Sequence, residues 1–172
     1  QMCIRDRLYT HTFTQDEYGA LSLAYGFMGF ALILYRYGMD TALMKYSVQK
    51  QGPERKKYIT LIIVTQFITS FLFTFIIYST RLSTAEYVLG TYRPDWISYL
   101  AVILFFDALW NLPLLILRSE EKAIPYIFLS LLNVILTMAL NVMFVVYWEQ
   151  GIEGVFRANI IASAFIFLVS LP

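Results

Sequence analysis

Charged residues are scarce in this sequence, at 15% of 172 residues against roughly 25% in a typical soluble domain. The formal net charge is only +1, so the chain lacks the basic excess on which nucleic-acid binding depends. Cys3 is the single cysteine and His11 the single histidine, which excludes an internal disulfide and a histidine-rich metal site. These shortages exclude a nucleic-acid-binding protein and a disulfide-stabilised secreted domain.

Sequence signatures of enzymes are missing as well. The chain contains no H-E-x-x-H, G-x-S-x-G, Walker-type phosphate loop or G-x-G-x-x-G motif. The long connection 81–95 has only Glu86 and Asp95 as acids, and no second catalytic group converges with them. We therefore expect a protein that is not an enzyme and that has no bound cofactor.

Apolar residues are abundant instead, at 59% of the chain. They gather in five long stretches, near 18–44, 58–80, 96–117, 123–148 and 154–172. A helix needs about 20 apolar residues to cross the roughly 30 Å hydrocarbon core of a bilayer, where backbone groups find partners only within the helix. The pattern predicts an all-α fold, a polytopic membrane helix bundle with about five transmembrane helices in one domain over residues 1–172.

Lysine and arginine are distributed unequally between the connections. Seven lie in two loops on one side of the membrane: Lys45, Lys50, Arg55, Lys56, Lys57, Arg118 and Lys122. On the other side the loops contain only Arg81 and Arg93. Because cytoplasmic loops are enriched in basic residues, loops 45–57 and 118–122 are predicted to be cytoplasmic. We therefore expect a multi-pass protein of the cell membrane.

Besides Arg157 at the start of the fifth stretch, three charged residues lie inside the predicted spans, where a charge is costly and usually faces a bundle interior or a water-filled cavity. Arg36 and Asp40 are four residues apart, so they share a helix face and can pair directly. Each has an alternative, because Asp40 is close to the lipid head groups and Arg36 can extend its stem to the same interface. Asp107 is too deep for that alternative. It either holds helices together through hydrogen bonds or takes part in transport.

Neutral polar residues accompany these charges. Asn111 follows Asp107 by one helical turn and shares its face. A polar stripe in the fourth span consists of Asn133, Thr137 and Asn141. Such residues either join helices by hydrogen bonds or line a substrate path.

The two ends of the sequence suggest that it is incomplete. Residue 1 is glutamine rather than methionine, and the last apolar stretch ends without a polar tail. Residues 1–7 resemble translated adaptor sequence, so we expect them to be non-native and give Cys3 no role. The expectation is a fragment of a longer membrane protein.

Several short motifs resemble those of one protein family, in the same order and spacing. Residues 13–23 (FTQDEYGALSL) resemble the start of the second helix of bacterial polysaccharide flippases, and residues 37–46 (YGMDTALMKY) resemble its end. Residues 117–123 (LRSEEKA) are similar to a cytoplasmic turn of that family, and residues 151–155 (GIEGV) to the turn before the sixth helix. The likeness extends over nearly the whole chain.

The resemblance implies the oligosaccharide (O-antigen type) flippase branch of the MATE-like multidrug/oligosaccharidyl-lipid/polysaccharide transporter superfamily. Such proteins have two six-helix lobes around a central cavity, and this chain would supply helices two to six, a partial N-terminal lobe. The implied function is translocation of polyprenyl-diphosphate-linked oligosaccharide across the bacterial inner membrane by alternating access, for lipopolysaccharide and related polymers. The implied partners are this lipid-linked glycan, membrane lipids and other polysaccharide-assembly membrane proteins.

On this interpretation the polar residues of the spans form the substrate and coupling sites. The expected substrate-binding residues are Arg36, Asp107, Asn111, Asn133 and Asn141. Arg36 is expected to bind the diphosphate, because a guanidinium binds phosphate oxygens in bidentate fashion. Asp107 and Asp40 are expected to couple transport to a proton or sodium gradient. Asp107 is also expected to pair with Arg36 between substrate encounters.

Other functional classes remain open. A cation-coupled drug antiporter of the same superfamily would have a second intramembrane acid near Asp107, on helices beyond this chain. A membrane-bound glycan polymerase or ligase would be an enzyme, with a long outer loop carrying several arginines and a histidine. A structural membrane subunit would tolerate substitution of Arg36 and Asp107.

Overall fold

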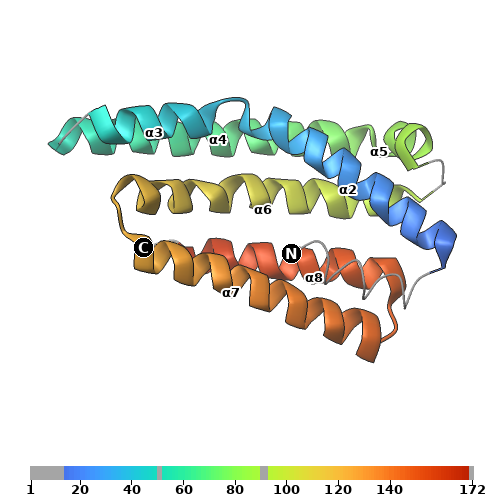
Figure 1. The fold of residues 1–172 in the computed structure, drawn as a ribbon. Coiled ribbons are helices and arrows are strands. Elements are labelled where there is room, and N and C mark those ends of the chain that lie inside the picture. Colours follow the sequence, from blue (N-terminus) through green and yellow to red (C-terminus); the bar gives the residue numbers. More distant parts are fainter. Residues whose placement is uncertain (1–13, 50–51, 90–92, 171–172) are drawn as a thin grey trace.

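The structure is a computed structural model that describes residues 14–49, 52–89 and 93–170, and these ranges contain helices and no strand (Figure 1). The α-helices are α2 (Gln15–Arg36), α3 (Met39–Gln49), α4 (Gly52–Ser79), α5 (Arg81–Thr84), α6 (Pro94–Ser119), α7 (Ala123–Asn141) and α8 (Gly151–Ser170). Two short π-helical segments are η1 (Ala85–Leu89) and η2 (Val142–Tyr147). Residues 1–7, which we expect to be non-native, and residues 171–172 lie outside the described residues.

Five helices are long and apolar enough to cross a membrane: Gln15–Arg36, Gly52–Ser79, Pro94–Ser119, Ala123–Tyr147 and Gly151–Ser170. The fourth of them consists of α7 together with η2. The predicted all-α fold with about five membrane helices is therefore confirmed, and it indicates a multi-pass membrane protein.

Helix α6 lies at the centre of the bundle. In Figure 1, α2, α3 and α4 lie on one side of α6, and α7 and α8 lie on the other. Leu100, Ile103 and Leu104 of α6 are almost fully buried in the apolar core that α2 and α8 share with it. Near one end of this core the Trp96 ring meets the Phe156 ring of α8 edge-on, with the ring centroids 6.0 Å apart. The core thus holds α2 and α8 against opposite sides of one helix.

The first helix begins at a capping box. The Thr14 hydroxyl oxygen accepts a hydrogen bond from the backbone N–H of Glu17, and the Glu17 carboxylate accepts one from the backbone N–H of Thr14. These contacts satisfy backbone donors that the first turn of any helix leaves without partners. Two hydrogen-bonded residues therefore determine where α2 starts.

The range 18–44, predicted as a single span, is divided between α2 and α3 by a break at Tyr37 and Gly38. Gly38 has a φ of 88°, in the left-handed region that glycine adopts without steric cost. The Tyr35 carbonyl, at the end of α2, accepts a hydrogen bond of 2.7 Å from the side-chain amide of Gln66 in α4. The buried Gln66 amide thus satisfies a carbonyl in the last turn before the break.

Candidate functional site

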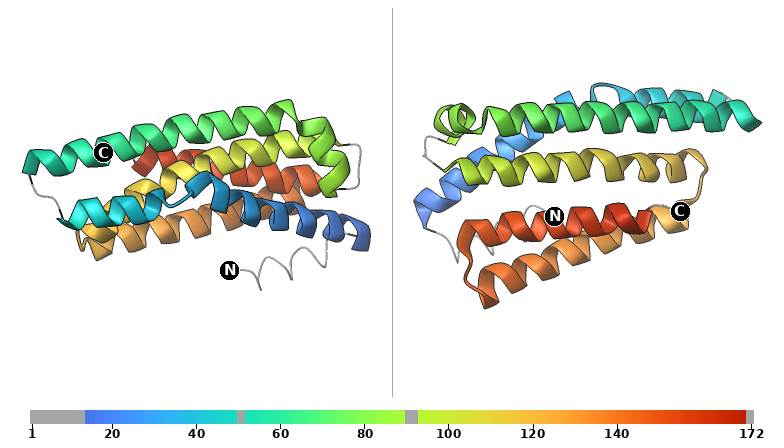
Figure 2. Two further views of the ribbon diagram at one scale, coloured as in Figure 1. Left: turned by 90° about the horizontal axis from the view of Figure 1, so that it is seen from above. Right: turned by 180° about the vertical axis from the view of Figure 1, so that it is seen from behind.

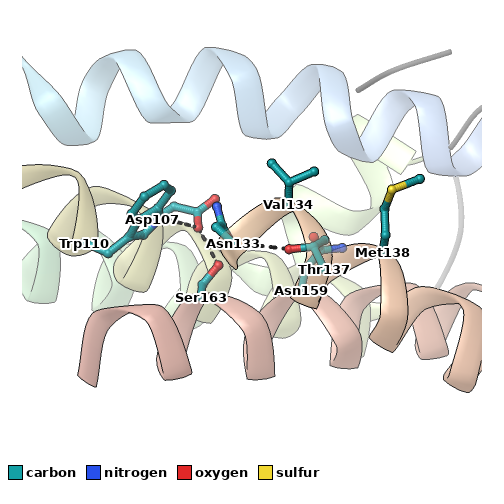
Figure 3. Close-up of a pocket in the computed structure, with 8 residues that line it drawn as sticks. All are labelled: Asp107, Trp110, Asn133, Val134, Thr137, Met138, Asn159 and Ser163. Carbon is teal, nitrogen blue, oxygen red and sulfur yellow. Dashed lines mark hydrogen bonds between the residues drawn. The ribbon is translucent and has the colours of Figure 1, made fainter. Parts of the chain in front are cut away.

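A polar cavity of about 170 Å³ lies between α6, α7 and α8 (Figure 3). Its lining consists of Asp107 and Trp110 from α6, Asn133, Val134, Thr137 and Met138 from α7, and Asn159 and Ser163 from α8. All three helices belong to segments that can cross a membrane. The cavity therefore gathers polar side chains inside an otherwise apolar bundle, where such groups are rare and usually functional.

Asp107 makes two side-chain hydrogen bonds, both through the same oxygen. Its Oδ1 accepts from the Ser163 hydroxyl at 2.6 Å and from the Trp110 indole N–H at 3.1 Å, as the dashed lines in Figure 3 show. No described residue donates to Oδ2. Asp107 therefore joins α6 to α8 through one oxygen and keeps the other free for a proton or a cation.

The polar stripe predicted on the fourth span divides in the structure. The Thr137 hydroxyl donates to Asn133 Oδ1 at 3.3 Å, and both side chains line the cavity. Asn141 is buried outside the lining, where its side-chain amide donates to the Thr137 carbonyl at 2.7 Å. Two members of the stripe thus face the cavity, and the third makes a hydrogen bond within its own helix.

A second polar cluster bridges the break between α2 and α3. Arg36, the last residue of α2, lies with Nη1 3.7 Å from Oδ2 of Asp40 in the first turn of α3. The side-chain amide of Asn111 in α6 donates to both carboxylate oxygens of Asp40 at 3.2 Å. The guanidinium side chain is 37% exposed, and its Nε is buried with no hydrogen-bond partner among the described residues. An anion could therefore reach the exposed part of the guanidinium but not the buried Nε.

Arg36, Asp40 and Asn111 form one group, and Asp107 lies in another. This separation differs from the expectation that Asp107 pairs with Arg36. Asn111 turns to Asp40, and Asp107 turns to Ser163. Arg36 pairs with Asp40 rather than with Asp107. The physical reason is the packing of α3, which begins after the break, against α6, where Asp40 meets Asn111.

Several residues of the site escaped sequence reasoning. Ser163 and Trp110 hold Asp107, and the side-chain amide of Asn159 donates to the Tyr25 hydroxyl of α2 at 3.3 Å. Each is a single neutral side chain within an apolar stretch, without a charge or a spacing that distinguishes it. Only the position of Asp107 shows that Ser163 belongs to a site.

Charged residues also form ion pairs at the two ends of the bundle. At one end, Glu120 accepts hydrogen bonds from Arg55 at 2.9 Å and from Lys122 at 2.7 Å. These bonds, the one from Lys122 contributing most, lower the pKa of Glu120 below its ordinary value. At the other end, Glu153 pairs with Arg157 and Arg93 at 3.6 and 4.0 Å. Ion pairs therefore link neighbouring elements at both ends of the bundle.

The geometry suits small charged groups. The cavity that Asp107 lines also contains the hydroxyl groups of Ser163 and Thr137 and the side-chain amides of Asn133 and Asn159, and hard cations prefer oxygen ligands of these kinds. Arg36 offers guanidinium donors to an anion. The described residues contain no group of three or more His, Cys, Asp or Glu side chains able to hold a metal ion.

Comparison with known proteins gives one result. A family model described as "polysaccharide biosynthesis protein" matches residues 12–171, which is nearly the whole chain. Comparison with the curated proteins and with the solved structures yields no match. An all-helical membrane bundle with an internal polar cavity thus carries the sequence pattern of this family along its length. The chain belongs to the polysaccharide biosynthesis protein family.

Proposed function

We propose that the full-length protein is a flippase that translocates polyprenyl-diphosphate-linked oligosaccharide across the bacterial inner membrane by alternating access. The observation that carries the proposal is the presence of two polar groups within a bundle of apolar helices: Arg36 with Asp40 and Asn111, and the cavity around Asp107. A protein that only anchors other components has no use for charges at this depth, because each one costs free energy in a bilayer. A carrier of an anionic head group uses them as a binding site.

Arg36 is the proposed contact for the diphosphate. Its guanidinium has five donors in a planar fork, and phosphate oxygens accept two of them at once. The pairing with Asp40 has a length of 3.7 Å, beyond good hydrogen-bond distance, and the guanidinium side chain is 37% exposed. Asp40 therefore neutralises Arg36 when no substrate is present and competes only weakly with a phosphate. Asn111 holds Asp40 in place for this role.

Asp107 is the proposed coupling residue, for a proton or a sodium ion. Its second oxygen would be the charged ligand, and the oxygens of Asn133 and Thr137, which belong to the same cavity lining, would be the neutral ones. Such a mixed oxygen set suits a cation of low charge. Asp40 is the second candidate, although Arg36 and Asn111 already occupy its carboxylate. The same cavity also supports the runner-up function, a cation-coupled drug antiporter.

A complementation assay with the full-length gene tests the proposal. In a strain that lacks its own flippase, Arg36→Ala should reduce surface polysaccharide at least about tenfold, because a charge-assisted hydrogen bond to substrate contributes about 1.5–3 kcal/mol. Arg157→Ala is the matched control, since Arg157 also pairs with an acid one helical turn away but lies at an end of the bundle. Lys at position 36 should restore part of the activity.

Membrane levels of each variant are measured by immunoblot so that folding defects are recognised. If Arg36→Ala exports glycan as well as the wild type, Arg36 does not bind the diphosphate. If Arg36→Ala and Arg157→Ala lose export equally at normal membrane levels, the loss of export is not specific to diphosphate binding by Arg36. Binding of the purified protein to a soluble polyprenyl-diphosphate analogue then separates substrate recognition from a general effect of lost charge.

A further inference from the structure

An apolar groove of about 460 Å³ lies between α4, α6 and α8, and none of its lining residues lines the polar cavity. The apolar side chains of its lining are Ile59, Ile63, Phe67, Leu109, Leu112, Pro113, Ile116, Leu117 and Phe167. Ile116 follows Asp107 by nine residues, and at about 100° per residue it lies on the opposite side of α6. Figure 2 shows α4, α6 and α8 side by side in its right-hand view. We propose that this groove binds one hydrocarbon chain of an anionic phospholipid.

The length of the groove matches one leaflet of a membrane. Ile59, Ile63 and Phe67 line it along successive turns of α4, which at about 1.5 Å per residue covers about 12 Å. One leaflet contributes about 15 Å of hydrocarbon, half of the roughly 30 Å core. A single acyl chain that enters from the end of the helices would therefore fill the groove to its inner end.

The mouth of the groove carries the charge that an anionic head group needs. Glu120 and Lys122 belong to the lining at this end, in the turn between α6 and α7. Arg55 and Lys122 share the single carboxylate of Glu120, so the three residues together keep one positive charge. The Lys122 side chain is 58% exposed, and its ammonium has donors beyond the one that Glu120 uses. A lipid phosphate at head-group depth would thus meet a partly unsatisfied cation.

The surroundings favour a lipid over water as the occupant. Ile63 and Phe67 are exposed on a helix that is able to cross a membrane. An apolar groove at this depth is not filled by water, because water there would lose its hydrogen-bond partners. A lipid chain fills the space without that cost. The volume of the groove is within the usual range for ligand pockets, about 300–1,000 Å³. This site is independent of the proposed transport function.

The test uses the purified full-length protein in phosphatidylcholine vesicles that contain a minor fraction of photoactivatable phosphatidylglycerol, with the reactive group along one acyl chain. After illumination, peptides are mapped by mass spectrometry. Labelling should concentrate on residues 59–67 and 109–117. Ile63→Trp should remove it, because the larger ring fills the groove. Val64→Trp is the matched control, on the same helix but outside the lining.

A second variant tests the head group without changing the packing. Lys122→Gln should weaken labelling by the phosphatidylglycerol probe about fivefold, since one basic residue near an anionic lipid contributes about 1 kcal/mol. Labelling by a phosphatidylcholine probe with the same reactive chain should not change. Lys57→Gln, also exposed but outside the lining, should affect neither probe.

Three outcomes would overturn the proposal. Unlabelled groove residues in the wild type would mean that another segment of the protein covers them. Equal labelling of Ile63→Trp and the wild type would mean that the chain lies elsewhere. Equal labelling by the two probes would remove the role of the anionic head group.

Discussion

Glu120 is the residue on which two basic side chains from different parts of the chain converge. Arg55 reaches it from the start of α4, and Lys122 reaches it from the following turn. Arg55 also donates from Nε to the Ser47 carbonyl of α3 at 3.0 Å. One carboxylate therefore links α3, α4 and the turn between α6 and α7, and its ionisation matters to all of them.

The stability of this link should depend on pH. Because hydrogen bonds from Lys122 and Arg55 lower the pKa of Glu120 in the folded protein, the stabilisation is complete above the ordinary glutamate pKa, about 4.3, and disappears as the pH falls through the lowered value. The melting temperature of the wild type in detergent should therefore fall more steeply below pH 5 than that of Glu120→Gln.

At neutral pH the wild type should exceed Glu120→Gln in stability by less than about 1 kcal/mol, as expected for a partly exposed ion pair. Glu121→Gln is the control, since Glu121 is an exposed glutamate of the same turn. Parallel melting curves for all three proteins across the acid range would contradict the role given to Glu120.

Among the elements, the broken span turns at Tyr37 and Gly38, which both have a positive φ. Gly38 and Gly29 both have open space where a methyl group would be added, but only Gly38 has a positive φ. Gly38→Ala should therefore destabilise the protein by roughly 1–2 kcal/mol, the cost of a left-handed conformation for other residues. Gly29→Ala, inside α2, should be neutral or stabilise by up to about 1 kcal/mol.

Chemical unfolding of the full-length protein in detergent compares the two alanine variants. The same measurement on Gln66→Leu reports on the other side of the break, where the amide holds the Tyr35 carbonyl. Equal stability of Gly38→Ala and Gly29→Ala would show that the chain does not need the break. A double variant that loses less stability than the sum of the Gln66→Leu and Gly38→Ala losses would show that the two act on the same turn.

Sequence reasoning predicts some elements well because their causes are local. The five membrane helices follow from runs of apolar residues, and the start of α2 follows from Thr14 and Glu17, three residues apart. The break after Arg36 was not predicted, because hydropathy does not change at Gly38. Its partner Gln66 lies 31 residues from Tyr35 in the sequence. No local pattern indicates that pairing.

The candidate site could likewise be predicted from the sequence only in part. The unusual position of Arg36, Asp40 and Asp107 could be predicted, because a charge in an apolar run is visible in the sequence alone. Their partners could not, since Asp40 and Asn111 are 71 residues apart and Asp107 and Ser163 are 56 apart. The sequence thus indicates which charges need partners, and only the packing of α3 and α8 on α6 supplies them.

For the whole molecule, the orientation in the membrane remains a prediction from charge. Loops 45–57 and 118–122 are expected on the cytoplasmic side. In a Cys3→Ser background, Glu149→Cys should react with an impermeant maleimide added to intact cells stripped of their outer membrane. Lys57→Cys should react only in inside-out vesicles.

Both cysteines occupy exposed positions, so burial does not limit either reaction. Reaction of Lys57→Cys in the intact cells and not in inverted vesicles would reverse the orientation. Labelling of the denatured proteins gives the total amount available in each sample.

The Arg36–Asp40 pair has a consequence for how the molecule responds to voltage. The two side chains carry opposite charges 3.7 Å apart. A rearrangement that moves them together through the membrane's electric field does almost no electrical work. A single unpaired charge that crosses the same field requires about 2.3 kcal/mol for each 100 mV. In the proposed alternating-access cycle, the intact pair would therefore add almost nothing to the voltage dependence of the empty carrier's return, and a ligand that separates the two charges would make the step sensitive to membrane potential.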